Sequence, residues 1–332
     1  MKKIFILLLT LILVGSLTAC TSNSENEQKT AQKSVTVVLD WTPNTNHTGL
    51  YVALEKDYFA AEGLDVEIIQ PPEDGAAPLV AAGKAQFGVD FQDYLAPAFT
   101  SSNPLPVTAI AALVQHNTSG IISLQAKNIK SGKDLMGKKY ATWDLPVEKA
   151  MLKRIVENDG GDFSQIELVP STVTDVISAL DSDIDAVWIF YAWDGIACQV
   201  KGIETNFFAF KDEEAVFDYY TPVLIANDQV LTDDPELAKA FLRATAKGYQ
   251  FAIDNPQDSA AILLKYAPEL DAEIVLASQQ WLADKYLDDA PQWGFFSEER
   301  WDAFYNYLYQ EGLIAEEIPA GTGFTNDYLP TE

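Results

Sequence analysis

The chain has 332 residues, and its 22 basic side chains are outnumbered by 49 acidic ones, giving a formal net charge of −27. Nucleic acid is therefore not expected as a partner, because proteins that bind it neutralise phosphates with Lys and Arg. Hydrophobic residues make up 48% of the chain, and Cys20 and Cys198 are its two cysteines. We expect stability to come from buried apolar cores and not from disulfides.

Residues 1–19 are predicted to be a signal peptide. Lys2 and Lys3 precede an apolar segment at residues 4–14, which is shorter than the roughly 20 residues of a membrane-spanning helix. The segment ends in Leu-Thr-Ala-Cys, which is typical of bacterial lipoproteins. We expect cleavage before Cys20 and a diacylglyceryl anchor on its thiol, since two acyl chains are enough for stable membrane attachment. An ordinary signal peptide with a chance cysteine is the alternative.

A flexible tether is predicted at residues 20–34, after the cleavage site. From Thr21 to Ser34 the chain is rich in Ser, Asn, Gln, Glu and Lys and has no aromatic or branched apolar residue. Such a composition cannot bury enough apolar surface to fold. About 300 residues remain beyond the tether. A single core rarely grows that large, so two lobes are expected.

Strand-like and helix-like segments alternate through the first two thirds of the folded part. Strands are expected at 35–39, 66–69, 87–89, 107–114, 121–124, 139–142, 167–169, 186–190 and 206–210, and helices at 49–61, 76–82, 95–100, 148–156 and 173–180. This alternation predicts an α/β fold with parallel sheets.

The remainder of the chain is predicted to be helical after one further strand-like segment at 219–225. Helices are expected at 235–251, 256–267, 272–287 and 297–309, from apolar residues at three- and four-residue spacing. Helices alone cannot build another α/β lobe, so we expect them to pack on the first. This gives lobe 1 as residues 35–119 plus 222–332 and lobe 2 as residues 120–221. A ligand cleft between two such lobes is expected.

Motifs for catalysis or cofactor binding are not found. The two histidines, His47 and His116, have no cysteine or second histidine at metal-ligand spacing. No dinucleotide fingerprint, phosphate-binding loop or nucleophile elbow is present in the sequence. We therefore predict no metal and no cofactor.

Polar and aromatic residues follow several predicted strands, where open α/β sheets place their ligands. The candidate ligand-binding residues in these loops are Asp40, Trp41, Asn44, Gln92, Asn117, Trp143, Tyr191, Trp193 and Asp194. The alternative is structural: Asn44 and its neighbours cap a helix, and Trp41, Phe190 and Trp193 lie in the core.

These residue types suit a flat nitrogen heterocycle. Aromatic rings can stack on it, and a carboxylate such as Asp40 or Asp194 can accept a hydrogen bond from an exocyclic amine or a ring N–H. The loops contain no cluster of arginines, which disfavours phosphorylated or carboxylate ligands. Together these features favour an aminopyrimidine.

The sequence from Val35, VTVVLDWTPNTNHTGLYVALEKDYFAAEGLDVEI, resembles the NMT1/THI5-like pyrimidine-precursor family. That family includes ThiY-like binding proteins and the fungal hydroxymethylpyrimidine synthases. The resemblance continues through QHNTSGIISL, ATWDLPVEKA, DAVWIFYAWDGIA, NFFAF, FDYYTPVLIAN and IPAGTGFTNDYLP, so that it extends from Val35 to Pro330.

The resemblance implies a two-lobed periplasmic-binding-protein fold of type II that holds a pyrimidine between aromatic rings. On the transport branch it implies a monomeric lipoprotein outside the cell membrane that delivers its ligand to an ABC permease. The implied ligand is N-formyl-4-amino-5-aminomethyl-2-methylpyrimidine or hydroxymethylpyrimidine, salvaged for thiamine. Another flat heterocycle such as riboflavin is the alternative cargo.

The chain departs from the synthase branch at two places. The family's pyridoxal-binding lysine and reacting histidine align with Asp90 and Tyr94, and the synthase's cysteine-rich segment before Tyr219 is missing. Without this lysine the pyridoxal cofactor has no anchor. The resemblance therefore favours a binding protein, with a synthase-like enzyme as the disfavoured alternative.

Overall fold

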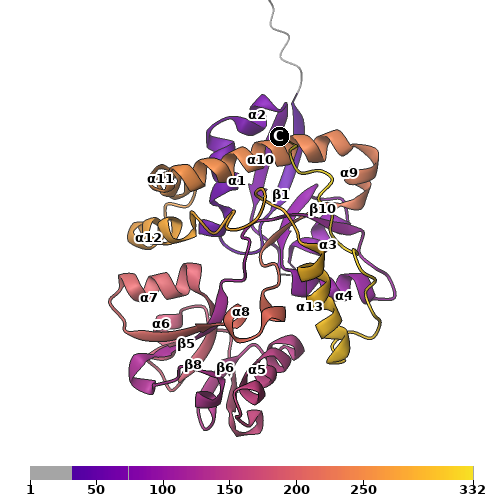
Figure 1. Cartoon of the computed structure of the whole chain (residues 1–332). Helices are drawn as coiled ribbons and strands as arrows, with labels where there is room; N and C mark the ends of the chain where they lie inside the picture. Colours follow the sequence, from indigo (N-terminus) through magenta and orange to yellow (C-terminus); the bar gives the residue numbers. More distant parts are fainter. Residues whose placement is uncertain (1–31, 74, 332) are drawn as a thin grey trace, which may run out of the picture. The chain divides into compact units, whose positions relative to one another are not determined.

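The computed structural model describes residues 32–73 and 75–331 (Figure 1). The predicted signal peptide, the predicted lipidation site Cys20 and all but the end of the predicted tether lie outside these residues. Over the described ranges, no helix is both long enough and apolar enough to cross a membrane.

The first lobe is built on a five-stranded sheet with the order β2-β1-β3-β10-β4. Its strands are β1 (Lys33–Val38), β2 (Leu64–Ile69), β3 (Phe87–Asp90), β4 (Val107–Ala112) and β10 (Val223–Asn227). Between the first four strands lie η1 (Thr45–His47), α1 (Thr48–Glu55), α2 (Tyr58–Ala61), α3 (Ala76–Ala81) and α4 (Gln92–Thr100). The central strands β3 and β10 are buried at every residue, as is typical of strands covered on both faces.

The expectation of parallel sheets was only partly correct. Strand β1 is parallel to β2 and β3, but β10 lies antiparallel between β3 and β4. The reason is the path of the chain. Val223, the first residue of β10, pairs with Asp90 and Ala112 at the carboxyl ends of β3 and β4, so the chain enters the sheet at that edge and runs back through it.

The second lobe repeats this plan with the order β7-β6-β8-β5-β9. Its strands are β5 (Ser119–Leu124), β6 (Lys139–Thr142), β7 (Glu167–Pro170), β8 (Ala186–Phe190) and β9 (Thr205–Ala209). Its helices are η2 (Gln125–Lys127), η3 (Gly132–Leu135), α5 (Pro146–Asn158), η4 (Phe163–Gln165), α6 (Val176–Leu180), η5 (Tyr191–Gly195), α7 (Ile196–Val200), α8 (Phe210–Glu213) and η6 (Ala215–Phe217). Strand β5 is antiparallel to both β8 and β9, because the chain also enters this sheet from the other lobe.

The C-terminal part is helical, as predicted. Its helices are α9 (Asp228–Asp233), α10 (Pro235–Asp254), α11 (Pro256–Tyr266), α12 (Ala272–Leu282) and α13 (Glu298–Gln310). Helix α10 lies beside α1 and α2 of the first lobe (Figure 1). Helix α12 ends five residues before the predicted position. The Lys285 carbonyl beyond its end accepts a hydrogen bond from the Gln115 N–H at 3.1 Å, which ties this turn to the segment that joins the lobes.

Two segments, residues 113–118 and 218–222, connect the lobes and lie side by side. The Leu113 N–H donates to the Pro222 carbonyl at 3.1 Å, and the Asn117 N–H donates to Asp218 Oδ1 at 2.9 Å. Away from these crossings, Lys201 at the end of α7 pairs with Asp271 at the start of α12. The crossings and this pair bring the carboxyl ends of strands from both sheets towards one cleft.

Candidate functional site

The carboxyl ends of β3, β6 and β8 lead into a small inner chamber of about 60 Å³. Strand β3 belongs to the first lobe, and β6 and β8 belong to the second. The main side chains of its wall are Phe91, Asp93, Tyr94, Trp143, Glu148, Trp188, Phe190 and Tyr219. The chamber is therefore aromatic and acidic, and it lies where α/β sheets bind their ligands.

A larger outer chamber of about 590 Å³ adjoins the inner one. Asp93, Tyr94, Leu145 and Val147 line both chambers, so the two form one continuous cleft. The outer chamber extends past the start of α3 and the end of α13. A ligand could place a ring in the inner chamber and its substituents in the outer one.

Short connections from strand to helix position the two acids of the inner chamber. Phe91 is the single residue between β3 and α4, which places Asp93 in the first turn of α4. Pro146 begins α5, where its missing N–H leaves no bond unmade, and Glu148 lies in the first turn of that helix. Both carboxyl groups therefore lie at a helix N-terminus, where the helix dipole favours negative charge.

Two aromatic rings face one another across the cleft. Phe91 of the first lobe and Phe190 of the second lie with their ring centroids 6.2 Å apart and their planes 18° from parallel. Trp143 packs against Trp188 at 5.7 Å with the planes tilted by 46°. The spacing of the two phenylalanines depends on the separation of the lobes, since each belongs to a different one.

Glu148 is held rigidly in the wall of the inner chamber. It is buried, and its two carboxyl oxygens accept hydrogen bonds from Tyr140 Oη at 2.9 Å and Thr142 Oγ1 at 2.8 Å. Burial raises the pKa of the carboxyl group, although these hydrogen bonds oppose the shift.

Two further carboxyl groups, those of Asp93 and Asp90, line the cleft. Burial raises the pKa of Asp93 to about 7, and the neighbouring Asp90 adds to the rise. Burial likewise raises the pKa of Asp90 to about 6, although the Phe91 and Ala77 N–H groups donate to it at 2.8 and 3.0 Å. The cleft thus gathers negative charge that the protein itself does not fully offset.

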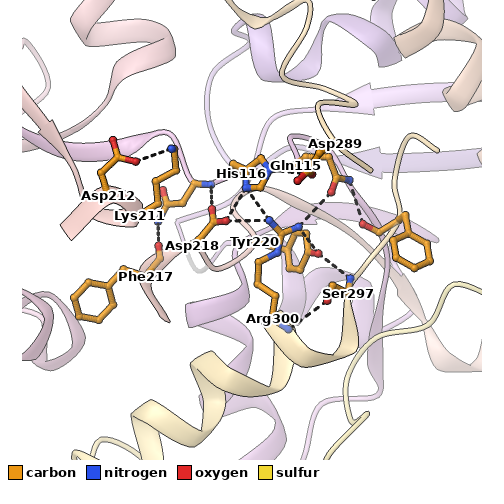
Figure 2. A network of polar contacts seen from close by, with 12 residues as sticks. Gln115, His116, Lys211, Asp212, Phe217, Asp218, Tyr220, Asp289, Ser297 and Arg300 are labelled. Carbon is orange, nitrogen blue, oxygen red and sulfur yellow. Dashed lines mark hydrogen bonds and ion pairs between the residues drawn. The ribbon is translucent and has the colours of Figure 1, made fainter. Parts of the chain in front are cut away.

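A separate cavity of about 680 Å³ lies at the crossings, between Trp281 and Lys285 of the first lobe and η5, β9 and α8 of the second. Its polar wall is an internally bonded network (Figure 2). His116 Nδ1 lies 2.6 Å from Asp218 Oδ2, and Arg300 Nη1 lies 3.1 Å from the same oxygen. The hydrogen bond to Asp218 raises the pKa of His116. Here Asp218 has two basic partners, and Asp212 pairs with Lys211.

Four of the predicted ligand residues make structural bonds instead of facing the inner chamber. Gln92 is buried and bonds the Trp301 carbonyl and the Tyr220 N–H, each at 2.8 Å. Asn117 donates to the Phe217 carbonyl at 2.8 Å, although it also lines the cavity at the crossings. Asn44 caps η1, as the structural alternative predicted, and Asp40 bonds His47.

The predicted aromatic residues are distributed over three places. Trp143 lines the inner chamber, whereas Tyr191 lines the cavity at the crossings. Trp193 packs against the core of the first lobe, and Trp41 is 57% exposed. Asp194 lines none of the three cavities, and burial raises its pKa to about 7. The structure does not bring the nine predicted residues together in one chamber.

Sequence reasoning missed Asp93, Tyr94, Glu148 and Trp188 as wall residues. Asp93 and Tyr94 stand in a loop that the sequence did single out, but Gln92 was chosen there. Glu148 follows Pro146 at the start of a helix, where an acid is ordinary. The available signal was that a strand, a short loop and an acid in the first helical turn occur twice, at 87–93 and at 139–148.

Comparison with known proteins identifies relatives along nearly the whole chain. A family model described as NMT1/THI5 like matches residues 44–259. A formylaminopyrimidine-binding protein of Halalkalibacterium halodurans is 30% identical over 331 residues, 98% of each chain. A 4-amino-5-hydroxymethyl-2-methylpyrimidine phosphate synthase of Legionella pneumophila is 24% identical and covers 89% of this chain and 92% of its own. The riboflavin-binding protein RibY of Chloroflexus aurantiacus is 21% identical over 99% of each chain.

Solved structures share the fold at much lower identity. The alkanesulfonate-binding protein SsuA from Xanthomonas axonopodis pv. citri superposes with a TM-score of 0.66 at 12% identity, covering 89% of this chain and 99% of its own. The periplasmic aliphatic sulphonate-binding protein SsuA from Escherichia coli gives 0.65 at 14%, covering 86% and 95%. The predicted two-lobed periplasmic-binding-protein fold is thus confirmed, and the chain belongs to the NMT1/THI5-like family.

Proposed function

We propose that the protein is an extracytoplasmic solute-binding protein of an ABC importer and that it binds a thiamine-related aminopyrimidine. The observation that carries this proposal is the inner chamber, where Phe91 and Phe190 face one another beside the carboxyl groups of Asp93 and Glu148. Parallel rings suit a flat heterocycle, and carboxylates suit its amino group. The formylaminopyrimidine-binding relative supports the same ligand class.

The dimensions of the inner chamber favour a single ring. A ring inserted between Phe91 and Phe190 needs about 7 Å, twice the roughly 3.5 Å contact distance of carbon atoms. The centroids are 6.2 Å apart, so a small separation of the lobes would admit one ring. The substituents of N-formyl-4-amino-5-aminomethyl-2-methylpyrimidine or of hydroxymethylpyrimidine would extend into the outer chamber of about 590 Å³.

Lobe closure couples binding to transport in this proposal. The lobes are joined by residues 113–118 and 218–222, and a ligand that contacts both Phe91 and Phe190 stabilises the closed state. The closed protein then presents a defined surface to the permease, which we propose as its partner. We further propose that the protein acts as a monomer.

We infer that the protein is a carrier and not a synthase. The family resemblance aligns Asp90 and Tyr94 with the synthase's lysine and histidine, and Asp90 accepts hydrogen bonds from two backbone N–H groups at the end of β3. A carboxyl group cannot form the Schiff base that pyridoxal phosphate requires. The test is absorbance after dialysis: the protein incubated with one equivalent of pyridoxal phosphate should retain no Schiff-base band, and a stoichiometric band that survives dialysis would contradict this inference.

We propose that Cys20 anchors the protein to the outer face of the cell membrane after removal of residues 1–19. The wild-type protein should sediment with membranes, whereas Cys20→Ser should be released into the soluble fraction. Membrane attachment of Cys20→Ser would contradict the anchor without affecting the proposed ligand.

Riboflavin is the second candidate ligand, because the riboflavin-binding relative covers 99% of each chain and the outer chamber is large. Isothermal titration of the full-length protein against the two pyrimidines, thiamine and riboflavin separates the candidates. We expect one-to-one binding of a pyrimidine. Preference for riboflavin, or no binding of either pyrimidine, would contradict the proposed cargo.

A further inference from the structure

Three carboxyl groups line the cleft without a cation to offset them. Glu148 lines the inner chamber, Asp90 the outer one, and Asp93 both. Burial raises the pKa of each, and no lysine, arginine or histidine among the described residues counters the shift. Carboxyl groups in such surroundings hold protons to a higher pH or require a positively charged partner.

Asp93 is the acid of this group that is free to bind a ligand. The oxygens of Asp90 accept from the Ala77 and Phe91 N–H groups, and those of Glu148 accept from two hydroxyls. Within the part of the chain that the structure describes, no side chain donates to Asp93, whose carboxyl group meets only N–H groups of its own helical turn. Because Asp93 lines both chambers, its remaining acceptor capacity is available to a ligand in the cleft.

The groups around Asp93 do not supply a positive charge. Asp90 stands before it at the end of β3, and Glu148 faces it from α5. The other titratable groups are the phenols of Tyr94 on the same helix and of Tyr219 and Tyr305 on packed elements. Their pKa values are raised, so they are neutral at physiological pH.

An aminopyrimidine can supply the missing charge. Its amino group feeds electron density into the ring, so a ring nitrogen is basic and can hold a proton beside a carboxylate. We propose that the cleft binds its pyrimidine as a cation, with the Asp93 carboxylate as the counter-ion of a protonated ring nitrogen. This inference rests on the proposed function and specifies its ligand: a basic heterocycle, and neither a phosphorylated one nor an anion such as a sulfonate.

The proton balance follows directly. At pH 8 the free pyrimidine is neutral and Asp93, whose pKa is about 7, is mostly ionised. Forming the ion pair therefore takes up close to one proton from solvent, which goes to the ring nitrogen. Above about pH 8, the affinity for the pyrimidine should accordingly fall by about tenfold per pH unit, because each complex takes up one proton as it forms.

Two measurements on the full-length wild-type protein test this at pH 8, using the formylaminopyrimidine and hydroxymethylpyrimidine labelled with ¹⁵N in the ring. Titration calorimetry in two buffers of different ionisation enthalpy counts the protons taken up. NMR of the bound ligand reports whether a ring nitrogen is protonated. We expect uptake near one proton and the upfield ¹⁵N shift of a protonated nitrogen.

Asp93→Asn should weaken binding by roughly 10- to 150-fold, the range for a lost charge-assisted bond, and abolish the proton uptake. Asp144→Asn is the matched control. Asp144 lies in the β6–α5 connection and pairs with Lys149, and Asn tolerates its left-handed backbone (φ 65°). This variant removes a nearby charge and should bind as the wild type does.

The outcomes separate the two proposals. If a pyrimidine binds with an unprotonated ring and no proton uptake, the cation inference is wrong and the proposed function stands. The same holds if Asp93→Asn binds as tightly as the wild type. If neither pyrimidine binds the wild type, the proposed function itself fails. Circular dichroism confirms that each variant is folded.

Discussion

The cleft and the crossings between the lobes are both rich in acidic residues, but they differ in whether these acids have basic partners. At the crossings Asp218 is paired with His116 and Arg300 (Figure 2). In the cleft Asp93 and Glu148 have no basic partner among the described residues. A paired network stabilises one conformation, whereas unpaired carboxyl groups destabilise the empty protein and favour a ligand that complements them. From this comparison we expect a structural role for the first region and ligand binding in the second.

The largest expected effect is on stability, from removing the cation at the crossings. Arg300 bonds Asp218, Gln115 and Tyr220, and its guanidinium lies 4.1 Å from the centre of the Tyr220 ring. Arg300→Ala should lower the free energy of unfolding by about 2 to 4 kcal/mol, because it leaves Asp218 without part of its counter-charge. Denaturant unfolding measures the change.

Arg243→Ala is the matched control for this prediction. Arg243 pairs with Glu62, but its side chain is 42% exposed against 19% for Arg300. Its loss should cost less than about 1 kcal/mol. Equal losses in the two variants would show that the network at the crossings is no more important than a surface pair.

The second effect is on affinity and tests which of the two regions holds the ligand. Phe190 lines the inner chamber, and Phe207, also from the sheet of the second lobe, lines the cavity at the crossings. Phe190→Ala should weaken pyrimidine binding by about 10- to 100-fold, because a stacked and buried ring is lost. Phe207→Ala should bind normally in the same calorimetric titration. The reverse result would move the site to the crossings.

The sequence predicted some features of the structure and missed others. The alternation of strands and helices predicted two α/β lobes, because burial periodicity is a local signal. The antiparallel course of β10 was not predicted, since it depends on where the chain returns from the other lobe. Trp143 was selected as a residue that follows a strand, and it lines the inner chamber.

Side-chain direction explains most of the remaining differences. Gln92 and Asn117 are polar and follow strands, as a ligand residue would, but packing turns both inward onto backbone groups. Asp93, one residue after Gln92, points into the cleft instead. In a helical turn, neighbouring residues face different directions, and only the packed structure decides which of them faces the ligand.

The third effect links stability to pH. Burial raises the pKa of Asp93 to about 7 from an ordinary value of 3.8, so the folded state binds its proton more tightly than the unfolded state does. This contribution to stability is present at pH 4 and is lost as the pH rises through about 7. Asp93→Asn should therefore stabilise the ligand-free protein by about 1 kcal/mol at pH 8 and by much less at pH 4.

Thermal unfolding of the two proteins at both pH values measures this difference. Asp144→Asn, which removes an exposed acid, should show no such pH dependence. A variant Asp93→Asn that is less stable than the wild type at pH 8 would mean that the carboxyl group is satisfied in the empty cleft. The contrast between the cleft and the crossings would then not hold.

The smallest expected effect concerns the closed state itself. Lys201 and Asp271 join the lobes through an ion pair whose side chains are both partly exposed, so its contribution is about 0.2 to 1 kcal/mol. Lys201→Ala should speed ligand dissociation by no more than about fivefold at low ionic strength and leave it unchanged at high salt, where the pair is already screened.

Lys247→Ala is the control, because it removes an ion pair within the first lobe. It should leave the rate of ligand dissociation unchanged at both salt concentrations. Stopped-flow dissociation at the two salt concentrations gives the answer. An equal change in both variants would trace the effect to overall charge, whereas a change confined to Lys201→Ala would mean that release requires the lobes to separate along α7 and α12.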